Sequence, residues 1–382
     1  MSTIYLDYNA TTRIDPEVLD AMLPFLKENF GNPSSIHRVG SQARAALDNA
    51  RERLAGLWLC KPGEVIFTSG GTESNNLAVM GMARRLKDRG RHLISSPTEH
   101  HAVLHCLDYL SRCEGFEVTL LTPDADGRVD PEAVRAAIRP DTILVSLMAA
   151  NNEIGTLQSV AEMGAICRER GVCFHTDAVQ WFGKEPVRGV GQFNADLVSI
   201  CAHKFHGPKG AGALYVRSPL QPHSLLFGGG HEQERRAGTE NLAGIIGLVT
   251  AAERFILEPV FPAGHLLGLR QKFRQTLVAV AGVKMRGSAE KCLSNTVAVT
   301  VDGCDSIGLL AALDLEGICA SSGAACSTGS LTPSHVLLAM GVSEALANSF
   351  VRFSMGRETT LDEIEHVSRI FPSIVARLRG RY

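Results

Sequence analysis

Short apolar runs alternate along this chain with longer stretches in which apolar residues recur every three or four positions. The short runs have the length of buried strands, and the longer stretches have the spacing of helices with one buried face. We expect strands at 64–68, 92–96, 116–121, 142–148, 172–176 and 195–200. We expect helices at 73–89, at 101–113, from the cap Asp130-Pro131 onward and at 159–170. This alternation predicts an α/β fold with a largely parallel sheet and helices on both of its faces.

The pattern changes near Glu253. A helical stretch at 266–280 precedes an apolar strand at 294–301, and shorter periodic segments predict helices at 306–315, 333–340, 343–349 and 361–379. We therefore predict a large domain over 13–255 and a smaller α+β domain over 256–382. Residues 1–12 are rich in Asn and Thr, so we expect an irregular arm that belongs to neither core and that we group with the smaller domain.

The composition is that of an ordinary globular protein: 382 residues, 45% hydrophobic and 20% charged. With 38 basic and 40 acidic residues the net charge is −2, so no nucleic acid or membrane surface is expected as a partner. The basic stretch at 84–89 is expected to be a solvated helix end. No apolar run approaches the roughly 18 residues of a membrane span, and the start has no leader pattern. Ten cysteines without C-x-x-C spacing fit a reducing, cytoplasmic protein.

Residues 69–74, SGGTES, join an expected strand to an expected helix. The free N–H groups and positive end of a helix that starts at such a glycine turn can hold a phosphate, and Thr72 adds a hydroxyl. The segment is neither a Walker A loop nor G-x-G-x-x-G. A simple capped turn between strand and helix is the alternative.

Two further polar segments follow buried strands. Asp177 stands at the carboxyl end of its strand, where ligands bind in open α/β sheets, with Gln180 three residues later. Asp177 could cap a helix, or it could pair with a protonated ring nitrogen. Lys204 follows the strand at 195–200. It could be a surface lysine, or a desolvated amine that acts as a nucleophile in Schiff-base chemistry.

A phosphate cradle, an acid for a ring nitrogen and a buried lysine are together the parts of a pyridoxal-phosphate site. The chain also resembles the cysteine desulfurases of the NifS/IscS type, which are class V aminotransferase-like enzymes of fold type I with a seven-stranded sheet in the large domain. The resemblance extends from Tyr5 to about Ile374. It rests on seven motifs in order: DYNATT at 7–12, GNPSS at 31–35, TEH at 98–100, NNE at 151–153, AHK at 202–204, RAGTEN at 236–241 and SSGAAC at 321–326.

The resemblance implies a role for each cofactor-binding residue. Pyridoxal 5'-phosphate is held as a covalent aldimine on Lys204, His100 stacks on its ring, and Asp177 pairs with the ring nitrogen. Gln180 and Asn152 lie near the phenolic oxygen, and Asn152 also lies near the substrate. The phosphate is held by the residues Gly71, Thr72, His203 and, from the neighbouring subunit, Thr239. Many relatives have Ser where this chain has Cys201, whose backbone can still contribute.

Cys326 lies among small residues with no apolar periodicity, as a catalytic loop thiol does. The resemblance implies that this thiolate attacks the sulfur of L-cysteine, while Lys204 and His100 handle protons and Arg352 binds the substrate carboxylate. L-alanine leaves, and a persulfide stays on Cys326. The sulfur then passes to an iron–sulfur scaffold or other acceptor protein. The position of Thr239 implies a homodimer with shared active sites.

Three alternatives are weighed against this prediction. His101 and His105 have the spacing of two metal ligands on a helix, but no third ligand is evident, so no resident metal is expected beyond a transient contact between the Cys326 persulfide and an iron–sulfur cluster. Transamination or selenocysteine lysis would use the same cofactor, yet transamination has no use for a loop thiol. A non-enzymatic scaffold would be expected to lack the cofactor-binding residues that are present here.

Overall fold

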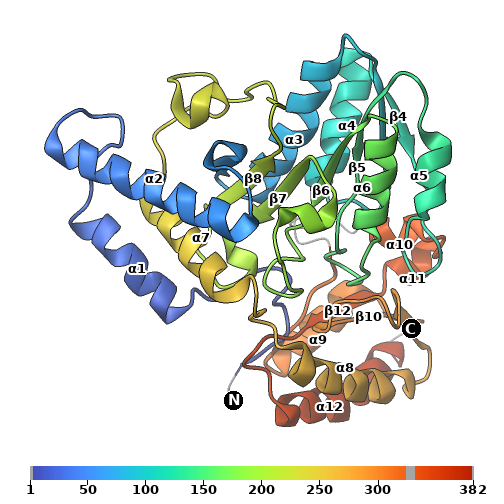
Figure 1. Cartoon of the computed structure of the whole chain (residues 1–382). Helices are drawn as coiled ribbons and strands as arrows, with labels where there is room; N and C mark the ends of the chain where they lie inside the picture. Colours follow the sequence, from blue (N-terminus) through green and yellow to red (C-terminus); the bar gives the residue numbers. More distant parts are fainter. Residues whose placement is uncertain (1–2, 324–331, 381–382) are drawn as a thin grey trace.

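The apolar runs of the first two thirds of the chain form one seven-stranded sheet, with the strand order β2-β8-β7-β6-β5-β3-β4 (Figure 1). The structure is a computed structural model that describes residues 3–323 and 332–380. Strand β8 runs antiparallel to both of its neighbours, and all other adjacent pairs are parallel. The strands are β2 Val65–Thr68, β3 His92–Ser95, β4 Glu117–Leu120, β5 Thr142–Ser146, β6 Cys173–Asp177, β7 Leu197–Cys201 and β8 Gly212–Val216. The predicted α/β class with a mostly parallel large sheet is confirmed.

Helices cover both faces of this sheet because side chains alternate between its two sides along each strand. On β5, Leu144 packs with one buried cluster and Val145 with the other. Helices α3 (Gly71–Leu86) and α4 (His101–Glu114) cover the Leu144 side. The Val145 side is covered by the helices α2 Arg38–Trp58, α5 Pro131–Ala137, α6 Val160–Glu169 and α7 Leu242–Phe255.

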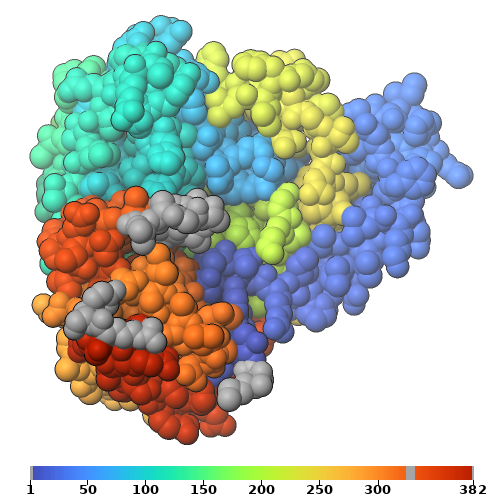
Figure 2. All heavy atoms as spheres, turned by 180° about the vertical axis from the view of Figure 1, so that it is seen from behind, coloured from blue at the N-terminus to red at the C-terminus, as the bar shows by residue number. Residues whose placement is uncertain are grey.

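A second, antiparallel sheet of order β12-β10-β9 lies beside the first, in the lower part of Figure 1. Figure 2 shows, from behind, the orange and red residues of this part against the cyan and blue residues around the large sheet. The ring of Phe353 on this sheet packs edge to face against the rings of Phe273 and Phe371, which lie on the helices that cover the sheet. Its elements are α8 Ala263–Val278, β9 Val283–Arg286, β10 Thr296–Val301, α9 Ser306–Leu315, α10 His335–Ala339, α11 Glu344–Ala347, β12 Phe350–Ser354 and α12 Leu361–Arg379. All its strands come after residue 255, although the domain boundary itself stays a prediction.

The first residues of the chain are not an irregular arm outside both cores, and that prediction is wrong. Strand β1 (Ile4–Tyr5) pairs in parallel with β11 (Ile318–Cys319), and Asp7 forms a bridge with Ser354 of β12. Ile4, Leu6 and Tyr8 are buried in the core. These apolar residues alternate with period two, which is a strand pattern that the Asn and Thr content of the segment concealed.

Some elements are not predicted by the sequence pattern, namely α1 (Pro16–Lys27), α2, α7, β8 and β9. Helix α1 begins after Asp15, whose side chain accepts a hydrogen bond from the Glu17 N–H, with Pro at the first helical position. Figure 1 shows α1 and α2 projecting from one side of the molecule. No helix in the described part of the chain has the length and apolar character needed to cross a bilayer.

Candidate active site

A cavity of about 300 Å³ opens at the carboxyl ends of β5, β6 and β7, against the N-terminal segment and β12. The structure brings nearly all the predicted site residues to this one cavity. Those that line it are Gly71, Thr72, His100, Asn152, Asp177, Gln180, Cys201, His203, Lys204 and Arg352. Thr239 is not among them. It lines separate cavities with Arg236 and Glu240 or with Asn32 and Arg44, so its predicted reach into a neighbouring subunit stays a prediction.

Lys204 lies in the short 3-10 turn Ala202–Lys204, which follows β7 directly. Its Nζ donates hydrogen bonds to the carbonyl oxygens of Asn9 (2.7 Å) and Ala10 (2.8 Å). No carboxylate forms an ion pair with it among the residues that the structure describes. Burial lowers the pKa of the Lys204 amine, and Arg352 lowers it further. A larger share of this amine is therefore uncharged and nucleophilic than for an ordinary lysine.

Asp177 ends β6 and is buried. One carboxylate oxygen accepts the Val179 N–H (2.9 Å) and the other accepts the Asn75 side-chain N–H (2.5 Å). Burial raises the pKa of Asp177, while the bond from Val179, the charge on a protonated His100 and the bond from Asn75 oppose that rise. The bond from Val179 shows that Asp177 also caps the turn after β6, so the two sequence interpretations are compatible.

Asn75 is a site residue that sequence analysis missed. It lies in the second turn of α3, is buried, and also lines the cavity. Its side-chain nitrogen binds Asp177, whereas its buried side-chain oxygen has no hydrogen-bond partner among the described residues. Asn75 directly follows the SGGTES segment on the same helix, and this position next to an expected phosphate site is the sequence signal that indicates it.

His100 is the N-cap of α4, and its Nδ1 accepts a hydrogen bond from the Ala102 N–H (3.0 Å). An accepting Nδ1 carries no proton, so the neutral ring has its proton on Nε2. Burial lowers the pKa of His100. The ring is therefore a cap and also a neutral group beside the cavity.

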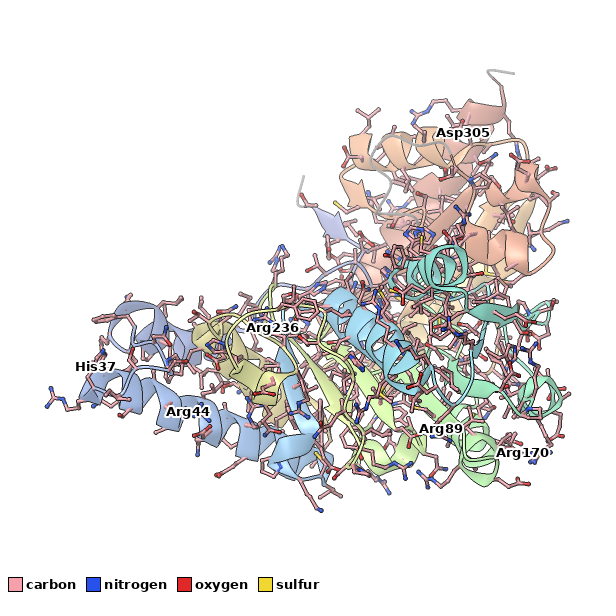
Figure 3. All side chains as sticks on the ribbon, turned by 90° about the horizontal axis from the view of Figure 1, so that it is seen from above. His37, Arg44, Arg89, Arg170, Arg236 and Asp305 are labelled. Atoms are coloured by element: carbon pink, nitrogen blue, oxygen red, sulfur yellow. The ribbon has the colours of Figure 1, made fainter. Side chains whose placement is uncertain are left out.

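The SGGTES turn forms the start of α3 at the cavity. Gly70 has φ +155°, and a side chain on Gly71 would come within 2.8 Å of Val179. These two positions therefore require glycine. The helix start at Gly71 and Thr72 lines the cavity, where N–H groups of a first helical turn can bind an anion. Glu73 accepts the Ser69 N–H (2.8 Å) and pairs with Arg236 (2.8 Å), which Figure 3 labels.

Cys201 and His203 complete this side of the cavity. Cys201 is buried at the end of β7. Burial raises the pKa of its thiol to about 11, so the thiol keeps its proton at neutral pH. His203 contacts Thr11 (3.1 Å), and burial together with Lys204 lowers its pKa to about 4, so its ring is neutral.

Arg352 of β12 is buried on the opposite side of the cavity. Its guanidinium donates to Asp7 (2.6 Å) and to the backbone oxygen of Asn152 (2.8 Å), while its Nε has no partner among the described residues. Three of its five N–H groups thus have no partner among the described residues. Asp7 belongs to the DYNATT motif, but the sequence alone predicts no role for it.

Cys326 lies outside the described residues, so its predicted place stays a prediction. On either side of the omitted stretch, Gly323 and His335 line the cavity. Glu153, a buried residue of the NNE motif, accepts a hydrogen bond from the Ser334 hydroxyl (2.5 Å), and Gly323 packs directly against its carboxyl group. Burial raises the pKa of Glu153 to about 7.

The imidazoles of His101 and His105 stack in parallel at 4.8 Å, and the ring of His335 lies 4.4 Å from that of His101. The described residues contain no group of three His, Cys, Asp or Glu side chains arranged to hold a metal ion. The basic stretch at 84–89 is a helix end, as expected: Arg84 pairs with Glu114, and Arg89 is exposed.

Comparison with known proteins gives a consistent result. The aminotransferase class-V family model matches residues 4–367. "Cysteine desulfurase IscS" of Dictyoglomus turgidum is 46% identical over 377 residues, which covers 98% of this chain and 95% of the relative. The protein of that name from Methanosarcina thermophila is 45% identical and covers 99% and 93%. A solved "NIFS-LIKE PROTEIN" superposes with a TM-score of 0.90 at 36% identity, over 98% of this chain and 100% of that one. The structure "SspA in complex with cysteine" has a TM-score of 0.82 at 36% identity, over 94% and 100%.

Proposed function

The chain belongs to the aminotransferase class-V family, and from that premise we propose how it acts as a cysteine desulfurase, which removes sulfur from L-cysteine and leaves L-alanine. The observation that carries the proposal is the convergence of Lys204, Asp177 and His100 on one cavity. They come from different loops at one edge of a sheet, where ligands bind in open α/β folds. The chain therefore has both the family's sequence and a cavity suited to the family's chemistry.

The residues around the cavity fit pyridoxal phosphate, on which enzymes of this family depend. The side-chain-free start of α3 suits the phosphate, and buried Asp177 suits a protonated ring nitrogen. Lys204 has a lowered pKa and forms no ion pair with a carboxylate among the described residues. Once bound, the cofactor would supply an electrophilic carbon for amines and a ring that withdraws electrons from the substrate Cα.

We assign the holding of this cofactor to residues on three sides. Gly71, Thr72 and His203 would bind the phosphate, with Cys201 contributing its backbone. His100 would lie against the ring face, because its cap bond to Ala102 fixes the imidazole beside the cavity. Asn152 and Gln180 would lie at the phenolic oxygen.

Lys204 would bind the cofactor covalently and then move protons. Its amine, left free when the substrate amine takes its place, would remove the proton from the substrate Cα. A lowered pKa suits this task, because a general base must be uncharged to accept a proton near neutral pH. His100, with Nε2 as its proton-bearing atom when neutral, is the second group that can hold a proton there.

Arg352 would bind the substrate carboxylate with the N–H groups that Asp7 and Asn152 leave free. That contact would orient the substrate sulfur toward the open side of the cavity. The Cys326 thiolate would attack this sulfur, so that a sulfur–sulfur bond forms, the substrate carbon–sulfur bond breaks, and its electron pair stays on the substrate. Protonation of the remaining carbon skeleton gives alanine.

The persulfide on Cys326 would then be attacked by a thiolate of an acceptor protein. We propose an iron–sulfur cluster assembly scaffold or another sulfur acceptor for this role, in the cytoplasm. We also propose a homodimer, in which Thr239 reaches the phosphate in the neighbouring subunit.

The deciding experiment records the absorbance of the purified protein and then measures alanine and sulfide after L-cysteine and dithiothreitol are added. A yellow protein that forms equal amounts of both is expected. Cys326→Ala should keep the colour and lose both products, whereas Cys113→Ala, a change at an exposed free cysteine, should alter neither. A protein that stays colourless with added pyridoxal phosphate, or a Cys326→Ala variant with full sulfide release, would contradict the proposal.

A further inference from the structure

A second lysine, Lys184, is buried beside the cavity without a role in the mechanism above. It lies in the turn after β6 and is 1% exposed, less than Lys204. No carboxylate pairs with it within the described part of the chain. Its Nζ lies 5.3 Å from the centre of the Phe261 ring. A buried lysine without an acidic partner is costly and rare, so its presence calls for a reason beyond packing.

The Nζ of Lys184 donates a hydrogen bond to the side-chain oxygen of Gln180, four residues earlier. The side-chain nitrogen of Gln180 donates to the backbone oxygen of Asn9 (2.9 Å). The same oxygen accepts a bond from Lys204 (2.7 Å). A continuous chain of hydrogen bonds therefore runs from Lys184 through Gln180 and Asn9 to Lys204.

These contacts fix which end of the Gln180 amide faces which neighbour. The Asn9 carbonyl can only accept, so it selects the amide nitrogen of Gln180. The Lys184 Nζ donates to the amide oxygen, and as an ammonium it could only donate, so it selects this end of the amide. An amide held in this way cannot flip without losing both bonds. The nitrogen keeps one N–H that is not used by Asn9, and Gln180 lines the cavity.

We propose that Lys184 is a positioning residue of the active site, which holds the Gln180 amide so that an N–H donor faces the cavity. This rests on the proposed function, in which Gln180 lies at the phenolic oxygen of pyridoxal phosphate. Lys184 does not touch the substrate in this account and acts through Gln180 alone. An oxygen atom bound in the cavity beside Gln180 would then accept a hydrogen bond from the Gln180 amide N–H.

The charge of Lys184 also affects the cavity. Burial, together with Lys204 and Arg352, lowers the pKa of Lys184 well below its usual value, while Cys201 acts in the opposite direction. Any positive charge that Lys184 carries favours a negative phenolic oxygen, and so does a donated N–H. Loss of Lys184 removes both effects. The protonated form of the cofactor would then persist to higher pH.

Lys184→Met tests the proposal because methionine has a similar length without charge or donor. The readout is the pH midpoint of the absorbance change of bound pyridoxal phosphate. We expect it to rise by about one unit, and kcat to fall by about tenfold with little change in KM. Lys284→Met, at an exposed position of β9, is the matched control and should match the wild type.

Two further measurements separate a positioning role from a structural one. Replacing a buried unpaired lysine by an apolar residue should leave thermal stability unchanged or raised. In a Gln180→Ala background, Lys184→Met should cause no additional shift of the midpoint, because the residue it acts through is gone.

An unchanged midpoint in Lys184→Met, an additive shift in the double variant, or failure of Lys184→Met to fold would each overturn the proposal. The last result would assign Lys184 to the core. If the wild type itself bound no pyridoxal phosphate, the proposed function would fail first. A yellow, active wild type with an unaffected Lys184→Met variant would refute only the positioning role.

Discussion

The two sides of the active cavity are built in different ways. On one side, Asp177 ends β6, Lys204 lies in the turn after the adjacent strand β7, and His100 caps the helix that follows β3. On the other side, Asn9 comes from the N-terminal segment and Arg352 from β12 of the smaller sheet. Parallel strand order alone places the first group together, whereas the second group meets only when the two parts of the molecule pack.

The two sides also differ in their electrostatics. On the strand-end side burial disfavours the charged forms: it lowers the pKa values of Lys204 and His100 and raises that of Asp177. The other side uses paired charge, with Arg352 bound to Asp7 at 2.6 Å. We infer that the first side serves proton movement and cofactor binding, and that the second serves recognition of a substrate carboxylate.

Among the changes that compare the two sides of the cavity, the largest effect on turnover is expected from Asp177→Asn, on the strand-end side. Asparagine has the same shape but no negative charge, so it cannot balance a protonated ring nitrogen. We expect kcat to fall by about 10²–10³-fold, the range for loss of one preorganised electrostatic contact. Steady-state alanine formation measures it, with the visible absorbance showing whether cofactor remains bound.

Asn75→Ala is the control for this side, because it removes only a hydrogen bond to Asp177. It should cost clearly less than Asp177→Asn. Equal losses in the two variants would mean that the charge of Asp177 is not what matters.

A smaller effect is expected on the other side from Arg352→Lys. Lysine keeps the charge but cannot offer the planar pair of N–H groups, and it loses the simultaneous contacts to Asp7 and Asn152. We expect kcat/KM for L-cysteine to fall by about 10–100-fold, mainly through KM, with an unchanged cofactor spectrum.

The matched control is Arg357→Lys, since Arg357 follows β12 but pairs with Asp15 away from the cavity. It should leave KM unaltered. A loss of cofactor absorbance in Arg352→Lys would contradict the assignment of cofactor binding to the strand-end side alone.

The smallest effect on turnover is expected at Glu153, which is better tested by stability. Its pKa is raised to about 7 by burial, so the folded state binds a proton that the unfolded state releases at lower pH. Stability from this group is therefore complete below about pH 4.5 and is lost as the pH rises to about 7, by at most about 3 kcal/mol.

Chemical denaturation across this pH range, in the wild type and in Glu153→Gln, isolates that contribution. Buried histidines such as His175 and His206 change stability in the opposite direction, because their pKa values are lowered to about 3 and about 4. Their effect is common to both proteins and cancels in the difference. A difference that does not vary with pH would show that Glu153 stays ionised.

The strand-end side could be predicted from sequence, and the other side only in part. Lys204 and Asp177 each follow an apolar run, so the pattern that predicts the sheet also predicts its ligand-binding edge. Thr72 was found because glycine turns before helices have a recognisable composition. The helices α3 and α4 were also expected within a few residues of their bounds.

Asn75, Asp7 and Lys184 were not predicted, for a common physical reason. Each forms a hydrogen bond with another site residue. Asn75 binds Asp177 and Asp7 binds Arg352, both distant in sequence, and Lys184 binds Gln180 one helical turn away. No periodicity marks such contacts, because they depend on how elements pack. The strand β1 was missed because its polar neighbours dominated the composition of a short segment.

The parallel pairing of β1 with β11 has a consequence for the order in which the enzyme can be completed on the ribosome. Ile4 is synthesised well before its partner Ile318. At roughly 5–20 residues per second, the roughly 300 residues between them take about 15–60 s to make. Until then the segment that carries Asn9 and Ala10 lacks the strand pairing of β1 with β11. The two carbonyl groups that accept the bonds of Lys204 therefore belong to a segment whose pairing is completed only after β11 has been made.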